Sequence, residues 1–218
     1  MMRPATKLKQ TSLVDQAVEQ LRSEIINGSL APGSPLAEGR ISETLGLARP
    51  TVREVLLRLQ SEGLVQRQGR GLPHAVTRID REQLVDIYTA RFHLESAGAR
   101  SFDTAAQPDR QLLDRSLEEL QSALASADRA TQIRLDAQCH SAVVGLTGSR
   151  RLITMHKQLL TEARLAAITA GLIDHEVAVA SHREFVEMLR AGQTEAACMQ
   201  LEKRLIVARE RLLQKLPA

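Results

Sequence analysis

The stretch from Ala37 to Val76 joins two short helical patterns to a hairpin pattern. The first, AEGRISETLGL, stops at Gly46, and the second, RPTVREVLLRLQSEG, has Pro50 in its first turn and stops at Gly63. The segment LVQRQGRGLPHAV follows, with two short apolar arms around a tip of glycine and arginine. Such a segment is typical of a β-hairpin. This order of elements is the strongest constraint that the sequence places on its fold.

A further helix is predicted before this stretch, over residues 12–27. Ser12 is a plausible N-cap, Gly28 is a stop signal, and the segment APGSPL that follows has the composition of a turn. The apolar residues at helical spacing are Leu13, Ala17, Leu21 and Ile25. Three helices followed by a hairpin make a winged helix-turn-helix, in which the third helix enters the major groove and the hairpin is the wing.

The remainder of the chain, after a linker around TRIDREQ, has long amphipathic stretches and no strand-like alternation. Helices are predicted near 80–104, 109–126, 129–147, 149–171, 174–191 and 193–215. The predicted fold class is therefore mainly α, with an N-terminal winged helix-turn-helix (three helices plus a β-hairpin wing) and a C-terminal all-α bundle of about six helices. Ligand and metal sites in bundles are built between facing helices.

Basic side chains are concentrated in the first third of the chain. Residues 1–78 hold 11 basic and 7 acidic side chains, and residues 79–218 hold 18 and 19. This division suits a module that faces nucleic acid joined to a neutral one. The two cysteines lack the spacing and density of a disulfide scaffold, the start MMRPATKLKQ lacks an apolar signal region, and no apolar run is long enough to span a bilayer. We expect a cytoplasmic protein that does not enter membranes.

Two arginines of the predicted third helix are candidates for contact with DNA. Arg49 and Arg53 stand four residues apart, opposite the buried stripe of that helix. A guanidinium group pairs with guanine in a bidentate manner or binds phosphate. Gly69 and Gly71 would let the wing approach the sugar-phosphate backbone closely, with Arg70 supplying charge. The alternative is that these arginines only solvate a helix, which the neighbouring wing disfavours.

The run LAEGRISETLGLARPTVREVLLRLQSEGLV resembles the DNA-binding signature of the GntR family of bacterial transcription regulators. The resemblance implies that the family's contacting arginines fall on Arg49 and Arg53. The arginine of the family's second helix falls on Gly39, with Arg40 beside it as a substitute, and Ala48 replaces a hydroxyl cap on the third helix. The DNA-binding residues expected are Arg40, Arg49, Thr51, Arg53, Gly69 and Arg70.

Three later segments, DIYTARFHLESAGAR, LDAQCHSAVVGLTGSRRL and SHREFVEMLRAGQTEAA, resemble the FCD effector domain of the FadR subfamily. The resemblance implies a domain that binds a small carboxylate metabolite, in many members against a divalent ion held by an Asp and three His. The expected organisation is a flexible N-terminal arm in residues 1–11, a DNA-binding domain in 12–78 and an effector-binding and dimerisation domain in 79–218.

Asp136 and His140 are the first half of a possible metal site. Their spacing of four places both side chains on one helical face, where they can close on one ion. The resemblance adds His182 but places Arg204 where a last histidine is expected. Two His and one carboxylate still leave open positions on Fe, Ni or Zn. A guanidinium group roughly 4 to 5 Å from a divalent ion repels it by several kcal/mol at an effective dielectric of about 20.

The sequence therefore favours loss of the metal, with Arg204 replacing both the ion and its charge. Arg204 would then pair with Asp136 or meet the effector's carboxylate directly. No cofactor is certain. The effector-binding residues expected, which include the inward-facing arginine of the first FCD helix, are Arg91, Asp136, His140, His182 and Arg204.

The remaining histidines and the two cysteines are not expected to bind a metal ion. His93 and His156 are expected to be ordinary surface or core histidines, and His175 is too far from His182 to share an ion. Cys139 and Cys198 point away from the face of their nearest site residue and are expected to be buried packing groups.

The expected function is that of a metabolite-responsive transcription regulator, most simply a repressor, that binds a pseudo-palindromic double-stranded DNA operator as a homodimer. A small organic acid in the helical bundle would alter the affinity for DNA. Two alternatives stay open. One is a metal-dependent enzyme using Asp136, His140 and His182, although HExxH, a phosphate loop and a nucleophile elbow are absent from the sequence. The other is a DNA-binding protein without a ligand.

Overall fold

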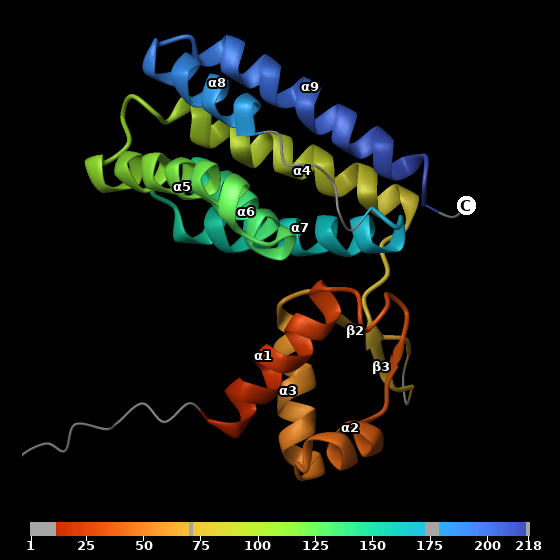
Figure 1. The fold of residues 1–218 in the computed structure, drawn as a ribbon. Helices are drawn as coiled ribbons and strands as arrows, with labels where there is room; N and C mark the ends of the chain where they lie inside the picture. Colours follow the sequence, from red (N-terminus) through yellow and green to blue (C-terminus); the bar gives the residue numbers. More distant parts are fainter. Residues whose placement is uncertain (1–11, 70–71, 173–178, 217–218) are drawn as a thin grey trace, which may run out of the picture. The chain divides into compact units, whose positions relative to one another are not determined.

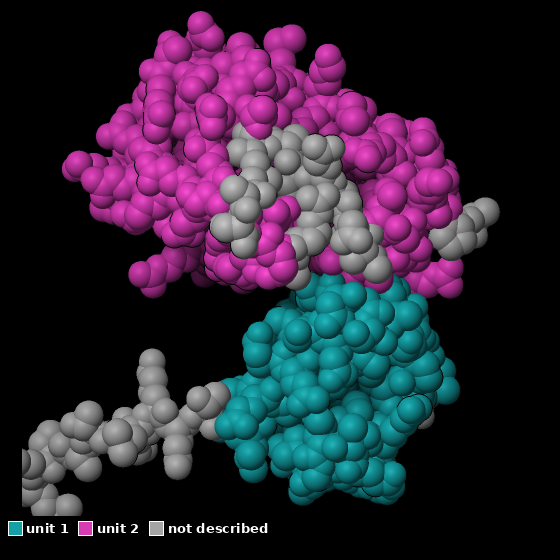
Figure 2. Space-filling model, in the orientation of Figure 1, with its two compact units in different colours: residues 1–77 teal, residues 78–218 magenta. Residues whose placement is uncertain are grey.

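The computed structural model describes residues 12–69, 72–172 and 179–216, and it forms two compact units, Met1–Thr77 and Arg78–Ala218 (Figure 2). The elements of the first unit are α1 (Leu13–Ile26), β1 (Pro35–Leu36), α2 (Glu38–Leu45), α3 (Arg49–Ser61), β2 (Val65–Arg67) and β3 (His74–Val76). Those described in the second unit are α4 (Arg81–Arg100), α5 (Gln107–Ser126), α6 (Arg129–Gly145), α7 (Arg150–Thr169), α8 (Val179–Arg190) and α9 (Thr194–Leu213). The predicted fold class is confirmed.

In the first unit, α1 packs against α3 around an aliphatic core (Figure 1). Helix α1 begins with a capping box, in which Ser12 and Asp15 satisfy each other's backbone N–H groups. The predicted stripes of both helices are buried, and the central members are Leu21, Ile25, Val52, Leu56 and Leu59. Burial of this face of α3 leaves its opposite face to solvent. The first predicted helix, over residues 12–27, differs from α1 by one residue at each end.

The wing is part of a three-stranded antiparallel sheet in the order β1-β3-β2. The sequence predicted the β2–β3 hairpin but only a turn in APGSPL, where the structure has β1. Leu36 of β1 pairs with His74 of β3, and Gly33 N–H donates to the carbonyl oxygen of Val76 at 2.9 Å. A strand of two residues is too short to show alternation, so the sequence carries no periodic signal for it.

In the second unit, α4 packs against α6, α7 and α9 (Figure 1). Helix α5 packs on α6 and α8, and α8 packs on α9. The close approach of α4 to α6 depends on Gly98, because a Cβ atom there would lie within 2.7 Å of the carbonyl carbon of Val143. The interior of this unit also contains buried polar side chains on α4, namely Arg91, Glu95 and Ser96.

Within the described residues, the predicted helix limits of the second unit lie within two residues of those observed, except at one helix end. The helix predicted over 80–104 ends at Arg100. Ser101 is its C-cap, and the N–H of Ser101 donates to the carbonyl oxygens of Gly98 and Ala99. The start of the helix predicted over 174–191 lies outside the described residues, as do His175 and the arm of residues 1–11. Among the described helices, none is long and apolar enough to cross a membrane.

The connection between the two units is short. The backbone N–H of Thr77 donates to the carbonyl oxygen of Leu64 at 2.9 Å, which holds Thr77 in the first unit. Asp80 is the N-cap of α4, and its side chain accepts from the backbone N–H of Gln83 at 2.8 Å. Only Arg78 and Ile79 lie between these two anchored residues.

Candidate functional site

Glu95 of α4 is fully buried and joins three helices. Its Oε1 atom accepts from Nε of Arg91 at 3.0 Å and lies 3.0 Å from Nε2 of His156 on α7. Its Oε2 atom lies 2.6 Å from Nδ1 of His140 on α6. A buried carboxylate is costly unless it is paired and hydrogen-bonded, and this one is both. Glu95 therefore fixes side chains from α4, α6 and α7 relative to one another.

The Glu95 carboxylate is ionised. Burial raises its pKa, but the interaction with His140, the charge of Arg91 and the hydrogen bonds from both imidazoles outweigh burial and hold that pKa well below its usual range. An ionised carboxylate only accepts hydrogen bonds, so the imidazole nitrogens that face it must carry the protons. His140 thus donates from Nδ1, and His156 donates from Nε2.

Protonation of Nδ1 leaves Nε2 of His140 free to act as an acceptor. Burial lowers the pKa of His140 to about 4, although the charges of Glu95 and Asp136 raise it, so the ring is neutral near pH 7. A neutral imidazole has one N–H group and one lone pair. The lone pair of His140 lies on Nε2, and that atom faces Asp136 at 3.8 Å.

Asp136, His140 and His182 form a cluster in which one ligand atom from each lies within 4.8 Å of the others. Nε2 of His182 lies 3.1 Å from Oδ1 of Asp136, and the two imidazole rings meet edge to face at 5.0 Å. Burial raises the pKa of Asp136, but the two histidines and Arg204 lower that pKa by more than burial raises it. The carboxylate is therefore ionised. The set fits a divalent cation, because a carboxylate behind His140 is the usual support of a metal-binding histidine.

Arg204 of α9 adds a positive charge beside this cluster. Its Nη1 atom donates to Oγ of Ser181 at 3.3 Å, and its guanidinium carbon lies 6.0 Å from the centre of the Phe185 ring. Its Nε atom is buried and has no hydrogen-bond partner within the described parts of the chain. Burial lowers the pKa of Arg204, as expected for a cation removed from water.

The ion pair between Arg204 and Asp136, one of the two roles that the sequence suggested for Arg204, is not formed. Across the described residues, no salt bridge within 4.0 Å links Arg204 to a carboxylate, and Asp136 is paired with the two histidines. The guanidinium group instead lies along the wall of a cavity. The second suggested role, contact with the carboxylate of a bound acid, is compatible with this position.

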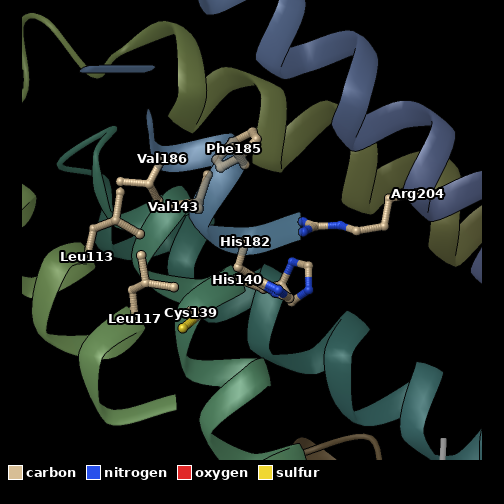
Figure 3. A pocket seen from close by; sticks show the side chains of 9 residues that line it. All are labelled: Leu113, Leu117, Cys139, His140, Val143, His182, Phe185, Val186 and Arg204. Atoms are coloured by element: carbon tan, nitrogen blue, oxygen red, sulfur yellow. The ribbon is translucent and has the colours of Figure 1, made fainter. Parts of the chain in front are cut away.

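The cavity lies between α5, α6, α8 and α9, and its empty volume, part of which is open to solvent, is about 260 Å³. Figure 3 shows the guanidinium group of Arg204 extending toward the two histidine rings. The lining residues are Leu113, Leu117, Cys139, His140, Val143, His182, Phe185, Val186 and Arg204. An aliphatic pocket with a few convergent polar groups is typical of a small-molecule site.

Several residues lie elsewhere than expected. Arg91 is buried, but it pairs with Glu95 and lies over the Tyr88 ring at 5.1 Å instead of lining the cavity. Cys139 is buried as predicted, yet it does line the cavity, and burial raises the pKa of its thiol to about 11. Sequence reasoning missed Glu95. The signal was present in the spacing of Arg91 and Glu95, which places an acid and a base on one helical face.

In the first unit, the exposed face of α3 carries Arg49 and Arg53. Nε of Arg53 donates to Oε2 of Glu38 on α2 at 2.8 Å. Arg40 is exposed on α2, and Thr51 is half-buried on α3. The structure therefore places these polar groups on neighbouring parts of α2 and α3.

Of the expected wing residues, Gly69 lies within the described part of the chain. Gly69 is half-buried, and a Cβ atom there would lie 3.1 Å from the Leu72 side chain. Arg70 and Gly71, at the tip, lie outside the described residues.

Two family models match the chain. Residues 13–71 match the bacterial regulatory proteins of the gntR family, and residues 86–205 match the FCD domain. The HTH-type transcriptional regulator YdhC of Bacillus subtilis is 26% identical over 87% of this chain and 86% of its own length. The HTH-type transcriptional repressor NanR of Cronobacter sakazakii is 26% identical over 93% of this chain and 85% of its own.

A solved structure of a GntR-type regulator is also similar to this chain over nearly its whole length. A GntR-type transcriptional regulator from Rhodococcus sp. RHA1 is 26% identical, with a TM-score of 0.78, over 95% of this chain and 100% of that one. These relatives are regulators and not enzymes, so the metal-dependent enzyme considered from the sequence is excluded. The chain belongs to the GntR family of bacterial transcription regulators and combines a GntR helix-turn-helix with an FCD domain.

Proposed function

We propose that this protein binds a pseudo-palindromic operator as a homodimer and changes its affinity for DNA when a small carboxylate metabolite enters the FCD domain. The observation that carries the proposal is the cavity, which Arg204, His140 and His182 line together with aliphatic side chains, and Asp136 clusters with the two histidines. Charged groups inside a helical core are costly, and perturbed ionisable groups around a cavity are typical of functional sites.

Residues 12–78 would read the duplex. The third helix of a winged helix-turn-helix enters the major groove, and the exposed side chains of α3 are the ones that can reach base edges. The residues assigned to this interface are Arg40, Arg49, Thr51, Arg53, Gly69 and Arg70. A single module has a small interface, which supports a dimer that reads two half-sites.

Residues 79–218 would bind the effector and form the dimer. Arg204 would meet the carboxylate of the acid, since guanidinium and carboxylate groups form strong charge-assisted hydrogen bonds. Asp136, His140 and His182 would hold a divalent cation such as Zn, Ni or Fe, which supplies a Lewis acid for a second polar group of the ligand. Glu95 and Arg91 would position these groups without touching the ligand.

Regulation follows from linkage between the two sites. A ligand that binds one arrangement of the helical domain more tightly shifts the population toward it, and the affinity for DNA changes by the same coupling energy. NanR, one of the relatives, is named a repressor, and this supports repression as the role here.

The test begins with selection of high-affinity duplexes from a randomised pool, because the operator is defined by the protein itself. Binding to the selected duplex is then measured by fluorescence anisotropy, with and without organic acids and zinc. We expect twofold-symmetric duplexes and an affinity that changes at least about fivefold with one acid. Affinity that no acid changes would indicate a ligand-independent DNA-binding protein.

A further inference from the structure

The first turn of α2 lies beside both of the α3 arginines that are assigned to the DNA interface. Oε2 of Glu38 accepts a hydrogen bond from Nε of Arg53 at 2.8 Å. A Cβ atom at Gly39 would lie 3.8 Å from Nη2 of Arg49, so the guanidinium group of Arg49 lies next to that glycine. Both arginine side chains of α3 therefore meet the same turn of α2.

Glu38 is held in place by the fold. Leu36 of β1, two residues before Glu38, is buried and pairs with His74 of β3. Ile41, three residues after Glu38, is also buried, and α2 packs on α3. The side chain of Glu38 is 29% exposed, against 62% for Arg53. The carboxylate is thus fixed beside a guanidinium group that stays accessible from solvent.

The ion pair between Glu38 and Arg53 fits recognition of a base edge and opposes contact with a phosphate. The bond to Glu38 uses Nε, whereas the two Nη groups of an arginine can make the bidentate contact with O6 and N7 of guanine. Arg53 can therefore read guanine while its Nε stays bonded to Glu38. A phosphate that approaches Arg53 would also approach the Glu38 carboxylate, which repels it.

This repulsion matters most for DNA of the wrong sequence, because phosphate contacts supply nearly all of non-specific binding. A plainer role for Glu38 is stabilisation of α2, since an acidic side chain in the first turn of a helix interacts favourably with the helix dipole. That role concerns folding, and it would affect the binding of every duplex equally. The contact with Arg53 predicts instead an effect on the difference between duplexes.

We propose that Glu38 determines DNA specificity by holding Arg53 in position for a guanine and by disfavouring its contact with phosphates. Specificity often depends on such an element that acts against the wrong partner. Glu38 acts through Arg53 and is a positioning residue. The proposal rests on the DNA interface of the proposed function and adds the residue that separates the operator from other DNA.

The test measures the affinity of the full chain for the selected duplex and for a scrambled duplex of the same length, by fluorescence anisotropy at one salt concentration. Glu38→Gln should bind the scrambled duplex more tightly than the wild type does. The ratio of the two affinities should fall about fivefold, the effect expected of one exposed ion pair. Selection from the randomised pool with Glu38→Gln should relax the same guanine that Arg53→Ala relaxes.

Two controls separate the contact with Arg53 from a general effect of charge. Glu43→Gln removes the same charge from an exposed position of α2, so it should raise both affinities equally and leave their ratio unchanged. In the Arg53→Ala background, Glu38→Gln should no longer lower the ratio. A wild-type ratio in Glu38→Gln, an equal fall in Glu43→Gln, or a fall that persists without Arg53 would each overturn the proposal.

Failure of this proposal is distinguishable from failure of the proposed DNA interface. A ratio that falls in Arg53→Ala but not in Glu38→Gln would exclude the role of Glu38 and leave the interface intact. A wild-type ratio in Arg53→Ala itself would exclude Arg53 from that interface, and the role of Glu38 with it.

Discussion

Oε2 of Glu95 on α4 lies 2.6 Å from Nδ1 of His140 on α6, so a buried carboxylate decides which nitrogen of that histidine faces the cavity. In many metal sites a carboxylate accepts a hydrogen bond from the metal-binding histidine. The carboxylate sets the orientation of the imidazole ring and raises the basicity of the nitrogen that binds the metal, and Glu95 stands in the same relation to His140. The cavity's chemistry thus depends on a residue that does not line it.

Replacing Glu95 by Gln should weaken zinc binding about 10- to 100-fold, measured by calorimetry in the presence of the acid that changes the affinity for the selected duplex. The amide keeps the shape but no longer requires His140 to be protonated on Nδ1. Nitrogen NMR of the histidine rings should show a second tautomer of His140 in the variant. Glu82→Gln, an exposed change in the first turn of α4, is the control and should behave as wild type. Unchanged zinc affinity together with an unchanged tautomer would refute this role of Glu95.

Arg204→His should produce a protein that binds zinc without an acid. The change supplies a fourth ligand and removes one positive charge, so zinc alone should raise the melting temperature clearly in the variant. In the wild type, zinc alone should raise it little, and protein purified without acid should contain far less than one ion per chain. Tightly held stoichiometric metal in the wild type would contradict this prediction.

Acid should destabilise the metal-free protein through His140. The folded-state pKa of His140 is about 4, below the roughly 6.5 of an unfolded histidine, so the unfolded chain takes up a proton first as the pH falls. This contribution to stability is complete above pH 6.5, and about 3 kcal/mol is lost as the pH falls to 4. Urea unfolding should show that the free energy of unfolding falls less between pH 7 and pH 5 in His140→Gln than in the wild type. An equal loss in both proteins would show that other groups are responsible.

Gly98→Ala should destabilise the protein by at least about 2 kcal/mol, because the added methyl group collides with backbone atoms of Val143 and Val144 on α6. Gly145→Ala is the matched control. No atom lies within 4 Å of the Cβ position there, and alanine favours helix, so that change should be neutral or stabilising. Thermal unfolding of the two variants makes the comparison. Equal melting temperatures would mean that α4 and α6 can separate at little cost.

Arg49→Ala and Arg53→Ala should each cost about 1 to 3 kcal/mol of binding to the selected duplex without changing the fold. Arg53 is held by Glu38 in the free protein, so its side chain is already oriented before DNA arrives. Arg70→Ala should weaken specific and non-specific DNA equally and reduce the salt dependence, because the wing meets the backbone. Anisotropy titrations at two salt concentrations distinguish these effects. Wild-type affinity in either α3 variant would exclude α3 as the reading helix.

The sequence predicted the fold well because helical periodicity and glycine stops are local signals. Ser12, Gly46 and Gly63 mark helix limits close to those observed. Among the described elements, β1 was the one missed, since two residues carry no periodicity. Asp136 and His140 were also visible, because a spacing of four is local. The contacts of Glu95 with His140 and His156 were not, since they join residues 45 and 61 positions apart, and no sequence period encodes a meeting of three helices.

The short connection between Thr77 and Asp80 limits how an effector signal can leave the helical domain. Thr77 is held by Leu64, and Asp80 is held by its own cap on α4, so Arg78 and Ile79 are the residues whose backbone is not fixed at either side. Each residue has two soft dihedral angles, so the connection contains few soft rotations. A signal carried along the backbone from α4 toward the first unit must pass through this two-residue connection.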